Sequence, residues 1–166
     1  MRYIPFRIEG VPVSKVRLPA PQGANREENM SAFTSGLHHL GFTVSDLAAA
    51  RGFFVEALGH QVVGEVPDYP AVFVSDGTTM ITLWQVEDPV TATGFDRRKN
   101  IGLHHAAFLV QTEALPELFD KVSTWPGVTV DAPISGVAPG MDASHFVVFV
   151  PGGPRVEFLC SPAVAA

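Results

Sequence analysis

Two nearly identical histidine-bearing segments occur in the 166-residue sequence. GLHHLGFTV at 36–44 returns as GLHHAAFLV at 102–110, with six of the nine positions identical and the paired histidines 66 residues apart. Histidine is a common ligand of divalent metals and a common acid–base group near neutral pH. The repeat therefore indicates either a duplicated unit whose histidines are packing residues, or two copies that together build one site.

Because side chains alternate along a strand, the two histidines of each pair point to opposite faces of the sheet. The larger apolar residues of each segment belong against a helix, so we expect His39 and His105 on the open face of the strand. Each is followed two residues later by a small residue, Gly41 or Ala107. These small residues leave room for a ligand above the histidines.

The other histidine of each pair, His38 or His104, falls on the helix side by the same alternation. We expect both to be packing residues whose replacement costs stability. Cys160 is expected to be a buried, inert thiol. As the single cysteine, it excludes an internal disulfide and a cysteine-cluster metal site.

The composition is that of an ordinary globular protein, with 46% hydrophobic and 17% charged residues. The net charge of −6 argues against a nucleic-acid partner, which requires a basic face. The longest apolar runs are far shorter than the roughly 20 residues of a membrane helix. The N-terminus lacks the continuous apolar core of a signal peptide. These features predict a cytoplasmic protein without nucleic-acid or membrane partners.

Residues 1–35 differ from the rest, with four prolines and no sustained hydrophobic period. We expect an N-terminal extension that is partly disordered, with one short strand near residues 6–8. Residues 26–29 read Arg-Glu-Glu-Asn just ahead of Met30, as a translated ribosome-binding sequence would. Met30 is therefore a candidate natural start, and residues 1–29 are either outside the natural protein or an ordinary polar linker.

The remaining sequence reads as two tandem βαβββ modules, an α+β fold. In module one, 36–88, a strand at 37–44 precedes a helix at 45–59, capped by Ser45 or Asp46 and ended by Gly59. Three strands follow, the last two joined at an Asp76-Gly77 turn.

Module two, 102–161, repeats this order after a linker at 89–101. A strand at 103–110 precedes a helix that starts at Thr112, then a strand at 128–134 and a hairpin that turns at Gly152 and Gly153.

Two motifs resemble the vicinal-oxygen-chelate superfamily, which includes glyoxalase I, extradiol dioxygenases, methylmalonyl-CoA epimerase, and fosfomycin- and bleomycin-resistance proteins. They are His-x4-Val-x-Asp-Leu at 39–47 and a Pro-x-Gly-x-x-x-Glu ending at 151–157. The resemblance covers 36–161. It implies a glyoxalase-like architecture in which each module forms half of an open barrel around a divalent metal.

The resemblance implies that His39, His105 and Glu157 are metal ligands. The fourth family position falls at Thr82, or at Ile81 if the turn is aligned without a gap, and neither is a usual ligand. Two histidines and one glutamate leave coordination positions open for a substrate with adjacent oxygens. The metal, Fe(II), Mn(II), Zn(II) or Ni(II), stays open.

Several further residues are candidates for the site. His145, twelve residues before Glu157, is either an acid–base or supporting histidine in the cleft or a surface histidine at a hairpin entry. Trp84 shares strand parity with Thr82, and both are expected to contact the substrate. The basic run at 97–99 is either solvated or holds an anionic substrate group.

Three functions remain open. The first is a metal-dependent lyase or isomerase with Glu157 and His145 as catalytic residues. The second is a non-haem Fe(II) dioxygenase, although the tyrosine expected at Val147 and a histidine expected within 137–143 are missing. The third is a metal-free protein that sequesters a small molecule. The resemblance also implies a homodimer whose sites join His39 of one subunit to His105 and Glu157 of the other.

Overall fold

The computed structural model describes residues 33–34 and 36–161. The expected strand near residues 6–8, the order of the extension and the Met30 hypothesis lie outside these residues. None of the helices in the described part of the chain combines the length and the apolar character needed to span a membrane.

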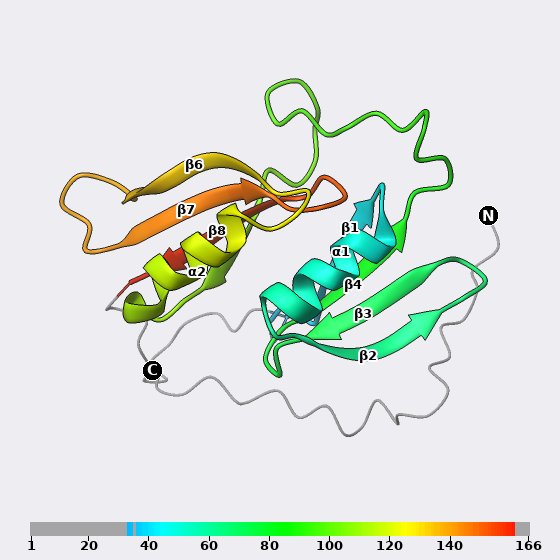
Figure 1. The fold of residues 1–166 in the computed structure, drawn as a ribbon, viewed down its shortest axis with the longest axis horizontal. Helices are drawn as coiled ribbons and strands as arrows, with labels where there is room; N and C mark the ends of the chain where they lie inside the picture. The colour runs from blue at the N-terminus through cyan, green and yellow to red at the C-terminus, as the bar shows by residue number, and fades with distance from the viewer. Residues whose placement is uncertain (1–32, 35, 162–166) are drawn as a thin grey trace.

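The first module is a four-stranded sheet covered by one helix (Figure 1). The sheet order is β1-β4-β3-β2, with β1 parallel to β4 and the other neighbours antiparallel. Its elements are β1 (His39–Val44), α1 (Leu47–Gly52), the π-helical turn η2 (Phe53–Ala57), β2 (Gln61–Val66), β3 (Ala71–Ser75) and β4 (Met80–Gln85).

The second module repeats this topology in the order β5-β8-β7-β6, with β5 parallel to β8. Its elements are β5 (Ala106–Leu109), the 3-10 turn η3 (Thr112–Ala114), α2 (Leu115–Ser123), β6 (Thr129–Gly136), β7 (Ser144–Phe149) and β8 (Arg155–Cys160). The predicted α+β fold of two βαβββ modules is thereby confirmed.

Local signals in the sequence explain the element boundaries. The Asp46 carboxylate accepts the Ala49 N–H at 2.9 Å and so caps the start of α1. Gly59 has φ +78° just after the helical segment, a left-handed conformation that favours glycine. Gly152 and Gly153 turn the β7–β8 hairpin with φ of +86° and +107°, as predicted.

The two modules share one hydrophobic core. Phe53 and Phe54, both fully buried behind the first sheet, contact Trp125 and Phe108 of the second module with ring centroids 6.4 and 6.3 Å apart. In Figure 1 the two sheets lie side by side, with α1 and α2 on the same side of the molecule. The modules therefore pack through their helix sides, and Cys160, 3% exposed, belongs to this core as expected.

The prediction that His38 and His104 pack against the helices is wrong. Both side chains are exposed, and each ring contacts the neighbouring histidine. Both residues lie outside the strands, where side chains need not alternate, because β1 begins only at His39 and β5 only at Ala106. Replacing either histidine should therefore cost little stability.

His60 is buried where the modules meet, with 6% of its surface exposed. Its ring lies 5.5 Å from that of Phe54 and 6.3 Å from that of Phe108. Burial lowers the pKa of His60 below its ordinary value of 6.5, an effect that Asp76 partly opposes. The neutral ring is therefore the form that the folded chain favours.

We predict that Gly152→Ala destabilises the protein more than Gly153→Ala. Both changes place alanine in a left-handed conformation, which costs about 1 kcal/mol. A Cβ at Gly152 would also lie 2.8 Å from Cβ of Val44 in the first module, whereas one at Gly153 would meet nothing within 4 Å. The overpacked contact should add about 1 kcal/mol or more to the loss in free energy of unfolding, measured by urea denaturation. Equal losses of stability in the two variants would show that Val44 can move away from the added Cβ at no cost.

We also predict that stability falls as the pH drops below about 6.5, in part because of His60. Its pKa is lower in the folded chain than in the unfolded chain, so the unfolded chain binds the proton first. The contribution of His60 is fully present above the unfolded-state pKa and is lost progressively below it. The free energy of unfolding should therefore decrease less between about pH 7.5 and about pH 5.5 in His60→Phe than in the unaltered protein. An unchanged slope in His60→Phe would contradict the prediction.

Candidate active site

Three of the predicted site residues meet on the open face of the second sheet. The Glu157 side chain, 12% exposed, lies on β8 between two histidines. Its Oε2 is 2.9 Å from Nε2 of His105, and its Oε1 contacts Nδ1 of His145. A largely buried carboxylate thus has one histidine on each oxygen.

Strand register explains why these side chains meet. Glu157 pairs with Ala107 of β5 on one side and with Val147 of β7 on the other. Within β7, His145 stands two residues before Val147 and so lies on the same side of the sheet as Glu157. His105 directly precedes β5, and its ring reaches the same carboxylate. His145 is therefore beside Glu157 and is not an isolated surface residue, while its chemical role remains a prediction.

The donor atoms of His105 and Glu157 suit a shared metal ion. Neighbouring ligands of an octahedral ion with bonds near 2.1 Å are roughly 3 Å apart, close to the 2.9 Å observed here. Within the described residues, however, no group of three or more histidine, cysteine or acidic side chains is arranged to hold a metal. His39 lies on the exposed side of β1, as predicted, and its ring contacts His38. One chain thus brings together two of the three predicted ligands, and the complete set stays a prediction.

The first module carries threonine where the second carries its glutamate. Gly41 pairs with Thr82 just as Ala107 pairs with Glu157, each pair lying two residues beyond the exposed histidine. This register identifies Thr82, and not Ile81, as the position equivalent to Glu157. The equivalent of His145 is Ala71, so the first sheet has no acid–base group at either position.

Thr82 and Trp84 form an aromatic patch with two residues that the sequence analysis did not identify. The Trp84 Nε1–H donates to Oγ1 of Thr82 at 3.0 Å, and the indole lies 5.1 Å from the ring of Tyr69 and 5.6 Å from that of Phe73. Gly41 lies opposite, where an added Cβ would come within 3.2 Å of the Thr82 hydroxyl. The alternation of β3 could have indicated Phe73, whereas Tyr69 precedes that strand and gave no signal.

The basic run at 97–99 is partly explained by ion pairs. Arg97 lies 3.4 Å from Asp131, a residue that also accepts from Arg155 at 2.9 and 2.8 Å. Lys99 pairs with Asp96 at 3.1 Å and is exposed. Asp131 lies at a bulge in β6, where strand alternation gives no guidance, so the sequence analysis did not identify it.

Arg155 lies on the same side of β8 as Glu157, two residues before it, and its guanidinium is 3.5 Å from the ring of His104. Loss of solvent contact and the positive charge of Arg155 both lower the pKa of His104. His104 is thus an exposed neighbour of the ionic cluster and not a core residue.

Comparisons with known proteins agree with this architecture. A family model described as the Glyoxalase/Bleomycin resistance protein/Dioxygenase superfamily matches residues 36–158. No curated protein sequence is significantly similar to the chain.

Solved structures show the same fold at low sequence identity. A glyoxalase family protein from Enterococcus faecalis is 20% identical with a TM-score of 0.61, over 76% of this chain and 98% of its own. Lactoylglutathione lyase from Agrobacterium tumefaciens is 18% identical with a TM-score of 0.56, over 81% of this chain and 99% of its own. A mutant of the fosfomycin resistance protein FosX from Listeria monocytogenes, complexed with Mn(II) and 1S,2S-dihydroxypropylphosphonic acid, is 17% identical with a TM-score of 0.62, over 78% and 94%.

These identities establish a common fold and no common activity. The family model covers most of the sequence and both modules, and the predicted resemblance to this superfamily is confirmed. The chain belongs to the Glyoxalase/Bleomycin resistance protein/Dioxygenase superfamily.

Proposed function

We propose that the protein is a divalent-metal-dependent enzyme of lyase or isomerase type, acting on a small substrate with two adjacent oxygen atoms. The observation that carries the proposal is the largely buried Glu157 with His105 on one oxygen and His145 on the other. A buried carboxylate needs a cation or several donors to offset its lost hydration. The Mn(II) complex of FosX, a distant structural neighbour, supports a metal on this fold.

His39, His105 and Glu157 are the proposed ligands of Fe(II), Mn(II), Zn(II) or Ni(II). Such an ion supplies Lewis-acid chemistry, stabilising negative charge that develops on a substrate oxygen. His145 is the proposed acid–base residue. Because its Nδ1 is held by Glu157, its Nε2 is left to accept a proton from substrate carbon next to a carbonyl and to return it.

The aromatic patch of the first module is the proposed wall for the apolar part of the substrate. Trp84 presents its ring beside Tyr69 and Phe73, and Thr82 adds a hydroxyl at the position equivalent to Glu157. One module would then provide the acid–base chemistry and the other would select the substrate.

We propose that the complete site forms in a homodimer. Within one chain the modules pack through their helix sides, and His39 has no contact with the Glu157 cluster. His39 of one subunit would then join His105 and Glu157 of the other.

We predict that His39→Ala, His105→Ala and Glu157→Ala each weaken metal binding by at least about tenfold. Loss of a residue that only supports a metal ligand already weakens binding by about 10- to 100-fold. The fold should persist, because all three side chains keep some exposure. Metal content after anaerobic purification and titration with Mn(II) or Fe(II) measure the effect. Circular dichroism checks the fold.

His38→Ala and His104→Ala are the matched controls, since each removes the neighbouring exposed histidine. Both should bind metal normally. Equal loss in His38→Ala and His39→Ala would show that the wrong histidine has been assigned. An unaltered protein that binds no metal at any concentration would favour a sequestering protein, and Fe(II) with oxygen uptake on a catechol would favour a dioxygenase.

We predict that inactive His39→Ala and inactive Glu157→Ala proteins restore activity when their subunits exchange. Each mixed dimer would hold one doubly altered site and one intact site, so random exchange gives about a quarter of all sites intact. Isomerisation of 2-oxoaldehyde hemithioacetals and metal content are the two readouts. If mass spectrometry shows mixed dimers and neither readout returns, the site lies within one chain.

A further inference from the structure

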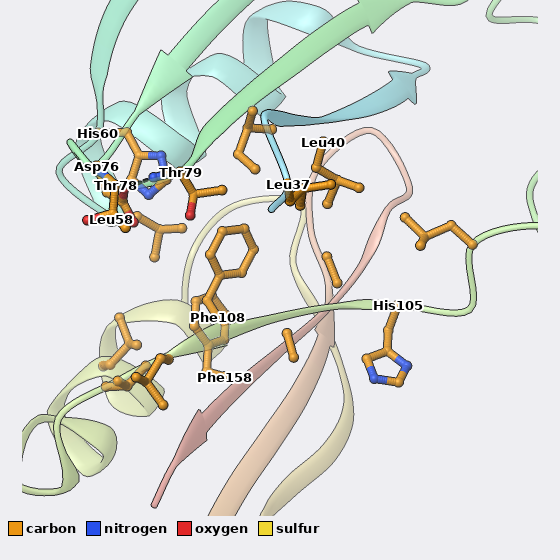
Figure 2. A pocket seen from close by; sticks show the side chains of 17 residues that line it. Leu37, Leu40, Leu58, His60, Asp76, Thr78, Thr79, His105, Phe108 and Phe158 are labelled. Atoms are coloured by element: carbon orange, nitrogen blue, oxygen red, sulfur yellow. Dashed lines mark hydrogen bonds between the residues drawn. The ribbon is translucent and has the colours of Figure 1, made fainter. Parts of the chain in front are cut away.

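A cavity of about 700 Å³ lies between the two modules. Figure 2 shows Leu58 of the first module facing Phe108 and Phe158 of the second across it. This volume is within the range of small-molecule sites, roughly 300–1,000 Å³. Of the ionic cluster on the open face, only His105 lines the cavity, and in Figure 2 it lies well apart from His60.

His60 lines this cavity and has no hydrogen-bond partner. Its Nδ1 is the one buried polar side-chain atom, in the part of the chain that the structure describes, that lacks a partner. The ring is held beside Phe54 and Phe108, so it cannot turn to solvent without disturbing the core. A buried polar group without a partner is uncommon in a folded protein and calls for a bound molecule, a water or a functional reason.

The surroundings of His60 determine the kind of group that it would bind. The β3–β4 turn contributes Asp76, Thr78 and Thr79 to the same part of the lining. The Asp76 carboxylate accepts the backbone N–H groups of Thr78 and Thr79 at 2.8 and 2.7 Å, which fixes a negative charge near the cavity. The lining contains no lysine or arginine.

An anionic ligand would meet the Asp76 carboxylate with no cation to balance it, and burial disfavours a charged His60. A hydroxyl group both donates and accepts, so it can pair with the neutral imidazole in either tautomer. The rest of the lining is largely leucine, isoleucine, valine and phenylalanine. The chemistry therefore matches an apolar molecule with one uncharged hydroxyl group.

We propose that the cavity between the modules is a second binding site, for an uncharged apolar molecule of the phenol class whose hydroxyl hydrogen-bonds to His60. Its polar end is built by His60 and the β3–β4 turn, and the cavity meets the proposed metal centre only at His105. Its apolar end is built by residues from both modules, so an occupant would bridge them.

The probe is 4-propylphenol, compared with propylbenzene and 4-propylbenzoate. Binding is measured by calorimetry on the full chain in the presence of a chelator, which removes any contribution of the metal centre. The NMR resonances of the histidine rings report where the probe binds. The phenol should bind about tenfold more tightly than propylbenzene, the value of one good hydrogen bond, and the benzoate more weakly still.

His60→Phe keeps an aromatic ring and removes the hydrogen bond. It should weaken phenol binding about tenfold and leave propylbenzene binding unchanged. His60→Gln, which retains a donor and an acceptor, should keep part of the preference. His38→Phe is the control, because His38 is exposed and does not line the cavity. If the His60 variants fail to fold, the His60 resonance of the unaltered protein still decides the question.

The proposal would be overturned if the phenol does not bind up to its solubility limit, or if it binds His60→Phe as tightly as the unaltered protein. It would also be overturned if the phenol shifts the NMR resonances of His105 and His145 but not that of His60. An ordered water on His60 that the probe does not displace would have the same meaning. Failure of metal binding in the unaltered protein would leave this site untouched. The two proposals therefore fail separately.

Discussion

The packing of the two modules through their helix sides is the constraint on which the rest of the structure depends. The contacts of Phe53 with Trp125 and of Phe54 with Phe108 each contribute about 0.5–1.5 kcal/mol beyond the area that they bury. They place α1 and α2 on one side of the molecule and leave the open faces of both sheets for other uses. The same packing encloses His60 between the modules.

The fold is duplicated, and its chemistry is not. At equivalent positions the second sheet carries His145, Arg155 and Glu157, whereas the first carries Ala71, Met80 and Thr82. One open face is therefore ionic and the other is aromatic and weakly polar. Neither face alone combines titratable groups with an aromatic surface, so the proposed site draws on both modules.

The sequence predicted most of the fold because local signals mark its boundaries. The Asp46 cap and the glycines at 59, 77, 152 and 153 have their expected roles in the structure. Strand alternation placed His39 and Glu157 correctly, since both lie within regular strands. It misplaced His104, because β5 begins two residues later than the repeat suggested.

Other features depend on contacts that no local pattern contains. The choice between Thr82 and Ile81 required the pairing of β1 with β4, and Asp131 lies at a bulge where alternation is interrupted. His60 follows the glycine that ends a helical segment and is buried only because Phe108 arrives from the second module. Long-range packing, rather than residue type, determines the environment of each.

The hairpin turn before β8 has two roles that tie stability to chemistry. The carbonyl of Gly152 accepts the Ser45 N–H of the first module at 3.0 Å, and β8 begins three residues later and carries Glu157. A substitution in this turn would disturb the joint between the modules and the orientation of the carboxylate together. On the proposed function, substitutions of Tyr69 or Trp84 in the other sheet would alter the surface that contacts the substrate without touching this joint.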